Sequence, residues 1–225
     1  MPWEGNCADR TAFRHFGGKG KKAGWSSGTP ISPPGFGGSG IGWRLNLVSD
    51  EADISAAELD FVHIDEHLVD LAIPVLRLLK RRSMSAATAE SCTGGLIATV
   101  LSEAPGAAEH FSGGFVVYTP EQKSAALGIS SRAIKQYGTV SREIAKAMAE
   151  AALQRSNADI AVGVTGVAGP DTDEKGNPVG LVYYACARNG VDTVIIQRSF
   201  GNVGRSRIRY SAAAEAMIIL KTCLS

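Results

Sequence analysis

The sequence lacks several features that would assign it to a specialised class of protein. Its 23 Lys and Arg residues are balanced by 22 Asp and Glu residues, a net charge of +1, so no basic surface for nucleic acid or anionic lipid is indicated. No apolar run approaches the roughly 18 residues that a membrane span requires, and no apolar signal-peptide segment follows the N-terminus. We therefore expect a cytoplasmic protein that binds neither nucleic acid nor a membrane.

Cysteine and histidine are also scarce, with four of each among 225 residues. The cysteines show no C-x-x-C pairing, which is typical of reduced thiols and not of a zinc site or a disulfide framework. His63 and His67 have the spacing of two ligands on one helix face, but position 64 is Ile, so the glutamate of the H-E-x-x-H motif is absent. We predict no metal and no other cofactor.

The N-terminal part of the chain differs in composition from the rest. Its first 50 residues hold 11 of the 26 glycines, 4 of the 9 prolines and all three tryptophans, without a sustained apolar period. The run from Gly35 to Gly40 matches G-x-G-x-x-G, but two prolines precede it and no helix pattern follows, so a dinucleotide site is not indicated. We expect residues 1–57 to be disordered, as a targeting peptide or a stretch translated from a wrongly chosen start codon, and residues 58–225 to form one domain.

From about residue 58 the pattern predicts alternating helices and strands. Helices are expected over residues 64–82, 96–101, 120–127, 144–153 and 205–222, and strands over residues 85–88, 114–118, 158–164, 181–187 and 191–199. Asn189-Gly190 between the last two strands is a strong hairpin signal, so an antiparallel pair should join a sheet otherwise built by helical crossovers. The fold class is therefore α/β with a mixed sheet. The small-residue face of helix 144–153 could serve a homodimer.

The most informative run is Ala-Glu-Ser-Cys-Thr-Gly-Gly at residues 89–95, which places Ser91 at a predicted strand-to-helix corner. Gly94 and Gly95 permit a tight turn, and the free N–H groups of the next helix favour a phosphate or a developing oxyanion. Cys92 is a second candidate nucleophile because a helix N-terminus lowers the pKa of a thiol. The alternative is that Ser91 and Thr93 only cap the helix.

A second strand-to-helix corner carries Tyr118 and Lys123. The strand of residues 114–118 reads as buried, Thr119 is a good N-cap, and Pro120 suits the first helical position. If this strand is a parallel neighbour of the strand before Ser91, then Ser91, Tyr118 and Lys123 meet at the carboxyl edge of one sheet, where open α/β sheets bind ligands.

A third candidate loop follows the strand of residues 158–164. Thr165, Gly166 and Gly169 suit close backbone approach to a phosphate or carboxylate. Residues 171–178 then form a polar loop that could cover the site. The three loops together predict a site for a small anionic ligand.

The quoted motifs resemble those of a known family. In the same order along the chain, residues 60–223 are similar to the C-terminal domain of the competence/damage-inducible protein CinA, a domain that also stands alone as a nicotinamide-nucleotide amidase. The resemblance rests on residues 89–95, the Phe-Val-x-Tyr-x-x-x-x-Lys pattern of residues 115–123, Val140-Ser141, residues 165–170 and Pro178-Val-Gly180.

The resemblance implies a three-layer α/β/α sandwich with a mixed, mostly parallel sheet, and hydrolysis of the carboxamide of nicotinamide mononucleotide to nicotinate mononucleotide and ammonia. The catalytic residues would be Ser91, Tyr118 and Lys123: Ser91 the nucleophile, Lys123 its base and Tyr118 a proton relay or orienter. The substrate, a small nucleotide, would be bound by residues of the three loops and the last helix: Cys92, Thr93, Gly94, Gly95, Thr165, Gly166, Gly169 and Arg205. Relatives often carry an Asp near this arginine, where the present chain reads Gly201-Asn-Val-Gly-Arg205.

Two other functions remain open from the sequence. One is a non-catalytic module that binds a nucleotide or acts in competence. The other is an amidase of the same family with a different substrate. Intact Ser91, Tyr118 and Lys123 favour an enzyme over a binding module.

Overall fold

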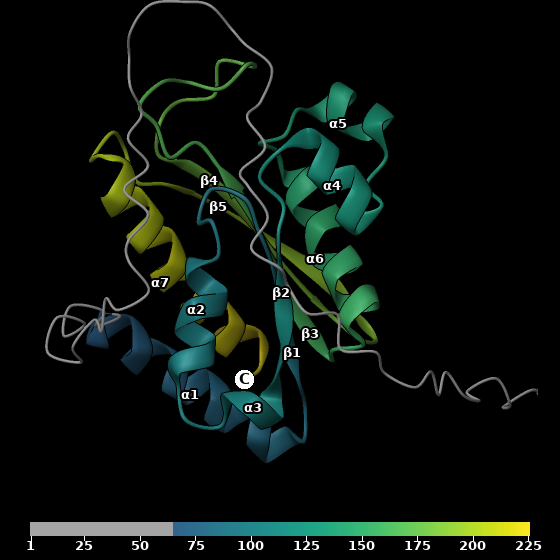
Figure 1. The fold of residues 1–225 in the computed structure, drawn as a ribbon, viewed down its shortest axis with the longest axis vertical. Helices are drawn as coiled ribbons and strands as arrows, with labels where there is room; N and C mark the ends of the chain where they lie inside the picture. The colour runs from purple at the N-terminus through teal and green to yellow at the C-terminus, as the bar shows by residue number, and fades with distance from the viewer. Residues whose placement is uncertain (1–64) are drawn as a thin grey trace, which may run out of the picture. The chain divides into compact units, whose positions relative to one another are not determined.

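The computed structural model describes residues 65–225, and the segment of residues 1–57 predicted to be disordered lies outside them. One mixed sheet stands between two layers of helices (Figure 1). The helices are α1 (Glu66–Arg82), α2 (Leu96–Glu103), α3 (Ala107–His110), α4 (Pro120–Leu127), α5 (Ser131–Tyr137), α6 (Arg142–Ser156) and α7 (Arg205–Cys223). The strands are β1 (Ala86–Glu90), β2 (Phe111–Val116), β3 (Ile160–Gly166), β4 (Leu181–Arg188) and β5 (Val191–Ser199).

The sheet has the strand order β2-β1-β3-β4-β5. Strand β1 pairs in parallel with both β2 and β3, whereas β4 is antiparallel to β3 and to β5. Four of the five strands therefore run in one direction, and the β4–β5 hairpin forms around Asn189-Gly190 as its sequence predicted. The expected meeting of the Ser91 and Tyr118 corners at one sheet edge follows from the parallel pairing of β1 and β2.

The alternation of side chains along β1 shows how two cores are built on one sheet. Ala86 faces a core that contains residues of α1, α2 and α7. Ala87 and Ala89 face a second core that contains residues of α4, α5 and α6. All five residues of β1 are buried because helices cover both faces. The three-layer α/β/α sandwich is confirmed.

Strand β2 is the main departure from the predicted elements. It spans residues 111–116, not 114–118, and alternates half-buried with exposed residues instead of being buried throughout. The cause is its position at the edge of the sheet, where β1 is the one strand of residues 65–225 that pairs with it. Consequently Tyr118 lies beyond the strand, in the connection that leads to α4.

The small-residue face of α6 packs against the sheet. Ile144, Met148 and Ala152 are buried there, and Ala147 and Ala151 are half-buried at the edge of the same core. A homodimer formed through this helix stays a prediction. Ser141 caps the helix as predicted, since its hydroxyl accepts the N–H of Ile144.

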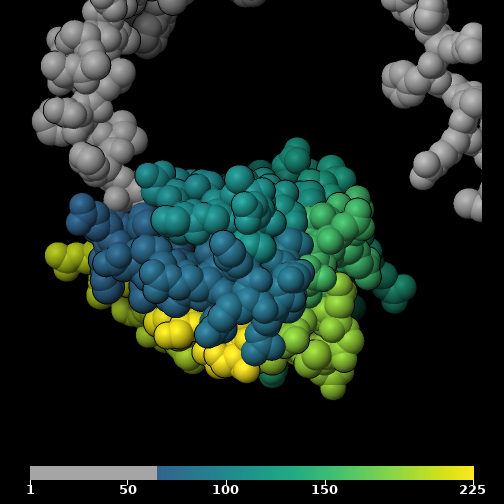
Figure 2. All heavy atoms as spheres, turned by 90° about the horizontal axis from the view of Figure 1, so that it is seen from below, coloured from purple at the N-terminus to yellow at the C-terminus, as the bar shows by residue number. Residues whose placement is uncertain are grey.

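In the helix layer on the side of the sheet opposite α6, the first described helix, α1, packs beside the last, α7. Figure 2 shows α1, in blue, beside the yellow end of α7. Arg82, the last residue of α1, donates a hydrogen bond of 2.9 Å to the main-chain oxygen of Ser225. Helix α1 passes through Pro74 without a break. None of the described helices is long and apolar enough to cross a membrane.

Gly163 provides a test of the packing between β3 and α6. A Cβ atom at this position would lie 2.6 Å from both the Ala145 oxygen and the Ala149 nitrogen, which are main-chain atoms that cannot move independently of the helix. We expect Gly163→Ala to lower the free energy of unfolding by about 1–3 kcal/mol, as overpacked cores do. Denaturant titration measures this loss. Ser112→Ala on the exposed face of β2 should change it by less than about 0.5 kcal/mol, and equal losses in the two variants would contradict the packing account.

Candidate functional site

Ser91 lies at the carboxyl end of β1, and Lys123 reaches it from the first turns of α4. The Lys123 Nζ atom is 2.9 Å from the Ser91 Oγ atom and donates a hydrogen bond of 2.8 Å to the carbonyl of Val117. The Ser91 N–H donates to the Val164 carbonyl of β3, which fixes the serine backbone to the sheet. The structure thus brings together the predicted nucleophile and the predicted base.

Burial changes the acid–base character of Lys123. Its side chain is 0% exposed, and no carboxylate of the described chain forms an ion pair with it. Removing an ammonium group from water disfavours its charged form, so the pKa falls from 10.5 to about 8. A fraction of Lys123 is therefore neutral near pH 7, and the neutral amine can accept the proton of the Ser91 hydroxyl.

Cys92 has the opposite character. Burial raises the pKa of its thiol from 9.0 to about 12, and the nearby Glu90 contributes to the rise. The effect of a helix N-terminus that the sequence suggested is outweighed by desolvation. Cys92 is protonated at neutral pH and is a poor nucleophile, although it lines the cavity beside Ser91.

Tyr118 is oriented toward Arg205, not toward Lys123. Its hydroxyl accepts a hydrogen bond of 2.9 Å from the Arg205 guanidinium, and no hydrogen bond joins it to Ser91 or Lys123 in the described chain. The same guanidinium donates to the Gly169 carbonyl at 2.9 Å. Tyr118 is 55% exposed. These contacts connect the second and third loops to the start of α7.

A cavity of about 200 Å³ lies in front of Ser91. Six of the predicted site residues line it, namely Ser91, Cys92, Tyr118, Gly166, Gly169 and Arg205. Lys123 lies behind Ser91, and Thr93, Gly94, Gly95 and Thr165 do not line the cavity. The sequence gave no role to Thr139 and Val140 and only a covering role to Asp171, Thr172 and Asp173, all of which line it.

The N–H groups after Ser91 are not equally free. Gly95 donates to the Glu90 carboxylate at 3.0 Å, and Gly94 donates to the Ser91 carbonyl at 3.1 Å. The N–H groups of Cys92 and Thr93 both interact with the Cys92 sulfur, and no oxygen acceptor for either is found within residues 65–225. This geometry differs from the expectation for Gly94 and Gly95. The Cys92 amide, which follows Ser91 and lines the cavity, is the candidate donor to an oxyanion.

Glu90 is a site residue that the sequence did not single out. It is completely buried, and both oxygens of its carboxylate accept hydrogen bonds from the first turn of α2. A side chain that caps a helix usually belongs to the residue directly before the first turn and accepts an N–H group two or three residues further along. Glu90 lies six residues before Leu96, the first residue of α2, so its sequence position did not indicate a cap.

Thr165 and Gly166 have structural contacts that explain their residue types. Thr165 donates its hydroxyl hydrogen to the Thr139 carbonyl at 2.8 Å. A Cβ atom at Gly166 would lie 2.7 Å from the carbonyl oxygen of Leu181, so glycine is required by the close approach of β4. Both residues therefore shape the cavity through the protein's own packing, whatever ligand it holds.

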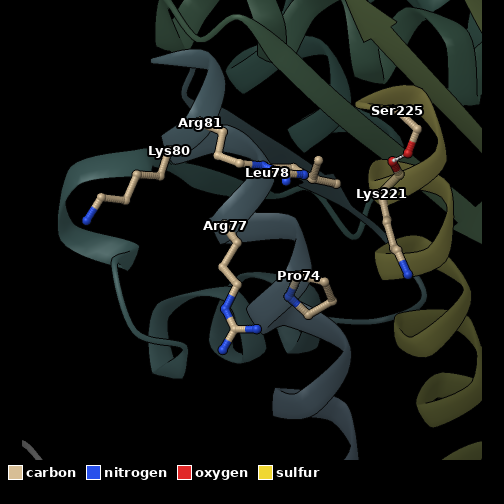
Figure 3. Close-up of a pocket in the computed structure, with 7 residues that line it drawn as sticks. All are labelled: Pro74, Arg77, Leu78, Lys80, Arg81, Lys221 and Ser225. Carbon is tan, nitrogen blue, oxygen red and sulfur yellow. Dashed lines mark hydrogen bonds between the residues drawn. The ribbon is translucent and has the colours of Figure 1, made fainter.

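A larger hollow of about 520 Å³ lies elsewhere, between α1 and α7 (Figure 3). Pro74 and Leu78 form its apolar part, and Arg77 and Lys221 flank it, while Lys80 points away. It contains no nucleophile paired with a base. No cluster of three metal-ligating side chains occurs within residues 65–225 either. The Ser91 cavity is accordingly the candidate active site.

Comparison with known proteins identifies the family of the chain. A family model, the CinA C-terminal domain, matches residues 69–224. A CinA-like protein of Acidobacterium capsulatum is 42% identical over 164 residues, which cover 73% of this chain and 39% of that protein. A CinA-like protein of Akkermansia muciniphila is 48% identical over 115 residues, which cover 51% of this chain and 28% of that protein. The chain thus spans two fifths or less of the length of these two relatives.

Solved structures cover the same region. The competence/damage inducible protein CihA from Agrobacterium tumefaciens superposes with a TM-score of 0.67 at 37% identity, covering 70% of this chain and 94% of that one. A CinA superfamily protein from Klebsiella pneumoniae gives a TM-score of 0.67 at 29% identity, covering 70% of this chain and 97% of that one. The family model and the solved structures agree on one assignment: the chain belongs to the family of the CinA C-terminal domain.

Proposed function

We propose that this domain hydrolyses the carboxamide of nicotinamide mononucleotide to nicotinate mononucleotide and ammonia. The observation that carries the proposal is the 2.9 Å contact between Ser91 Oγ and the buried amine of Lys123. Amide hydrolysis requires a nucleophile, a base for its proton, donors for the oxyanion and an acid for the departing ammonia. The site supplies a candidate for each.

In the first half of the reaction, Ser91 Oγ attacks the carboxamide carbon while Lys123 Nζ accepts the hydroxyl proton. The oxyanion of the tetrahedral intermediate accepts a hydrogen bond from the N–H group of Cys92, which lines the cavity beside Ser91. When the C–N bond breaks, Lys123 returns the proton to the nitrogen and ammonia leaves.

In the second half, water attacks the ester carbon and Lys123 takes a proton from it. The bond between the carbon and Ser91 Oγ breaks, the proton returns to the serine, and nicotinate mononucleotide is released. Lys123 thus acts as base and acid in turn, which suits a pKa of about 8.

The charges around the cavity fit a zwitterionic nucleotide. Arg205 is the cation that lines it and is the candidate contact for the phosphate, while Asp171 and Asp173 are candidates for the ribose hydroxyls. The positively charged pyridinium ring of the substrate would further disfavour the ammonium form of Lys123 and so favour the neutral base.

Two substitutions test the chemical assignment. Ser91→Ala and the nearly isosteric Lys123→Met should each lower the rate of ammonia release from nicotinamide mononucleotide by roughly 10²–10⁴-fold, because one removes the nucleophile and the other its base. Ser102→Ala and Lys146→Met, at exposed positions of α2 and α6, are matched controls that should retain full activity. Turnover at the wild-type rate in either site variant would refute the mechanism.

The pH dependence is a second test. Because Lys123 must be neutral to accept the serine proton, kcat/KM should increase about tenfold per pH unit below the pKa and level off above a pH of about 8. A series of buffers at constant ionic strength measures the profile. A rate that is independent of pH between 6 and 9 would exclude Lys123 as the base.

The contact between Tyr118 and Arg205 yields a third prediction. Since the tyrosine hydroxyl bonds Arg205 and not the lysine, Tyr118→Phe should raise KM more than it lowers kcat. Steady-state kinetics with nicotinamide mononucleotide separate the two. A loss of kcat as large as that of Lys123→Met would instead make Tyr118 a proton carrier.

A further inference from the structure

The Glu90 carboxylate accepts four hydrogen bonds, whereas the side chain that caps each of α1, α4, α5 and α6 accepts one N–H of its helix. Its Oε2 atom accepts from the N–H groups of Gly95 at 3.0 Å and Ile97 at 3.1 Å. Its Oε1 atom accepts from the Ala98 N–H at 2.8 Å and from the Thr88 hydroxyl at 3.3 Å. The side chain therefore bridges from the end of β1, across the Ser91–Gly94 turn, to the first turn of α2.

The main chain of Glu90 also belongs to the site. Its carbonyl accepts the N–H of Val117 at 2.8 Å, and the carbonyl of Val117 accepts a hydrogen bond from Lys123 Nζ at 2.8 Å. Lys123 in turn contacts Ser91, which follows Glu90 in the chain. These four residues close a ring of covalent and hydrogen bonds around the contact between nucleophile and base.

The buried charge of Glu90 is difficult to explain by folding alone. The side chain is 0% exposed, and no Lys or Arg of residues 65–225 forms an ion pair with it. The four donors offset the cost of burying the carboxylate, but a shorter neutral cap next to the helix start would satisfy α2 without burying a charge. What the longer, charged side chain adds is a fixed geometry for the turn between its donors.

We propose that Glu90 is a positioning residue that holds Ser91 in register with Lys123 and, by binding the Gly95, Ile97 and Ala98 amides, fixes the turn in which the Cys92 N–H faces the oxyanion. This inference rests on the proposed Ser–Lys mechanism but not on the identity of the substrate. It assigns to Glu90 no contact with the ligand.

The test uses a probe of Ser91 that does not depend on the substrate. Phenylmethylsulfonyl fluoride reacts with an activated serine when Oγ bonds to sulfur, the S–F bond breaks, fluoride leaves and the proton passes to Lys123. Wild type, Glu90→Gln and Glu90→Asp, each comprising residues 1–225, are incubated with the reagent at pH 9, and the adduct on Ser91 is followed by mass spectrometry. Glutamine loses the charge and half of the acceptor capacity, whereas aspartate keeps the charge but is one methylene shorter.

We expect Glu90→Gln to lower both the labelling rate and kcat by roughly tenfold to a hundredfold, because small displacements of a nucleophile cost this much. KM should stay unchanged, since Glu90 does not contact the substrate. Glu90→Asp should retain more activity than Glu90→Gln. Glu103→Gln, at an exposed position of the same helix, is the matched control and should behave as wild type.

Several outcomes would overturn the inference. One is a Glu90→Gln variant that still melts cooperatively and is labelled at a rate within twofold of wild type. Another is a loss of labelling rate in Glu103→Gln as large as the loss in Glu90→Gln. If Glu90→Gln does not fold, the Glu90→Asp variant takes its place, and labelling of that variant at the wild-type rate would overturn the inference. Absence of labelling in the wild type would contradict a positioned, reactive Ser91. Wild type that is labelled normally but releases no ammonia from nicotinamide mononucleotide would refute the proposed substrate and leave the role of Glu90 intact.

Discussion

The site depends on the burial of one amine. Lys123 lies where water does not reach it, with a hydroxyl and a carbonyl as its partners, and no carboxylate within residues 65–225 forms an ion pair with it. A neighbouring Asp or Glu would stabilise the ammonium form and remove the base. In the proposed mechanism, the arrangement of α4 against the sheet controls the reactivity of Ser91, because it decides how much solvent the lysine retains.

Much of the fold follows from local sequence signals. The Asn-Gly turn of the β4–β5 hairpin, the Thr119 and Ser141 caps and the glycines after Ser91 each have a physical requirement that a reader of the sequence can recognise. The position of β2 could not be read in this way. Whether a strand lies at the edge or in the centre of a sheet is decided by the crossover connections. The sequence of residues 111–118 is compatible with either position.

In the site, too, some features follow from local sequence signals and others from tertiary packing. Ser91 and Lys123 are 32 residues apart, and their contact requires only that β1 and β2 be parallel neighbours, which the sequence made plausible. The hydrogen bond from Arg205 to Tyr118 spans 87 residues and depends on where α7 begins relative to the sheet. Side-chain orientation at that distance is set by tertiary packing, so the sequence identified both residues but not their pairing. The proposed role of Glu90 could not be predicted for a related reason, since its four donors become neighbours only when the turn is formed.

Val117 illustrates that a residue can contribute to such a site without a characteristic side chain. Its N–H is held by Glu90 and its carbonyl by Lys123, so both of its contributions to the site come from the main chain. Any residue with a free N–H and a side chain that fits the core can make them, whereas proline cannot. The proposed site therefore contains a position that contributes through its main chain and tolerates many side chains, and searches for invariant residues would pass over it.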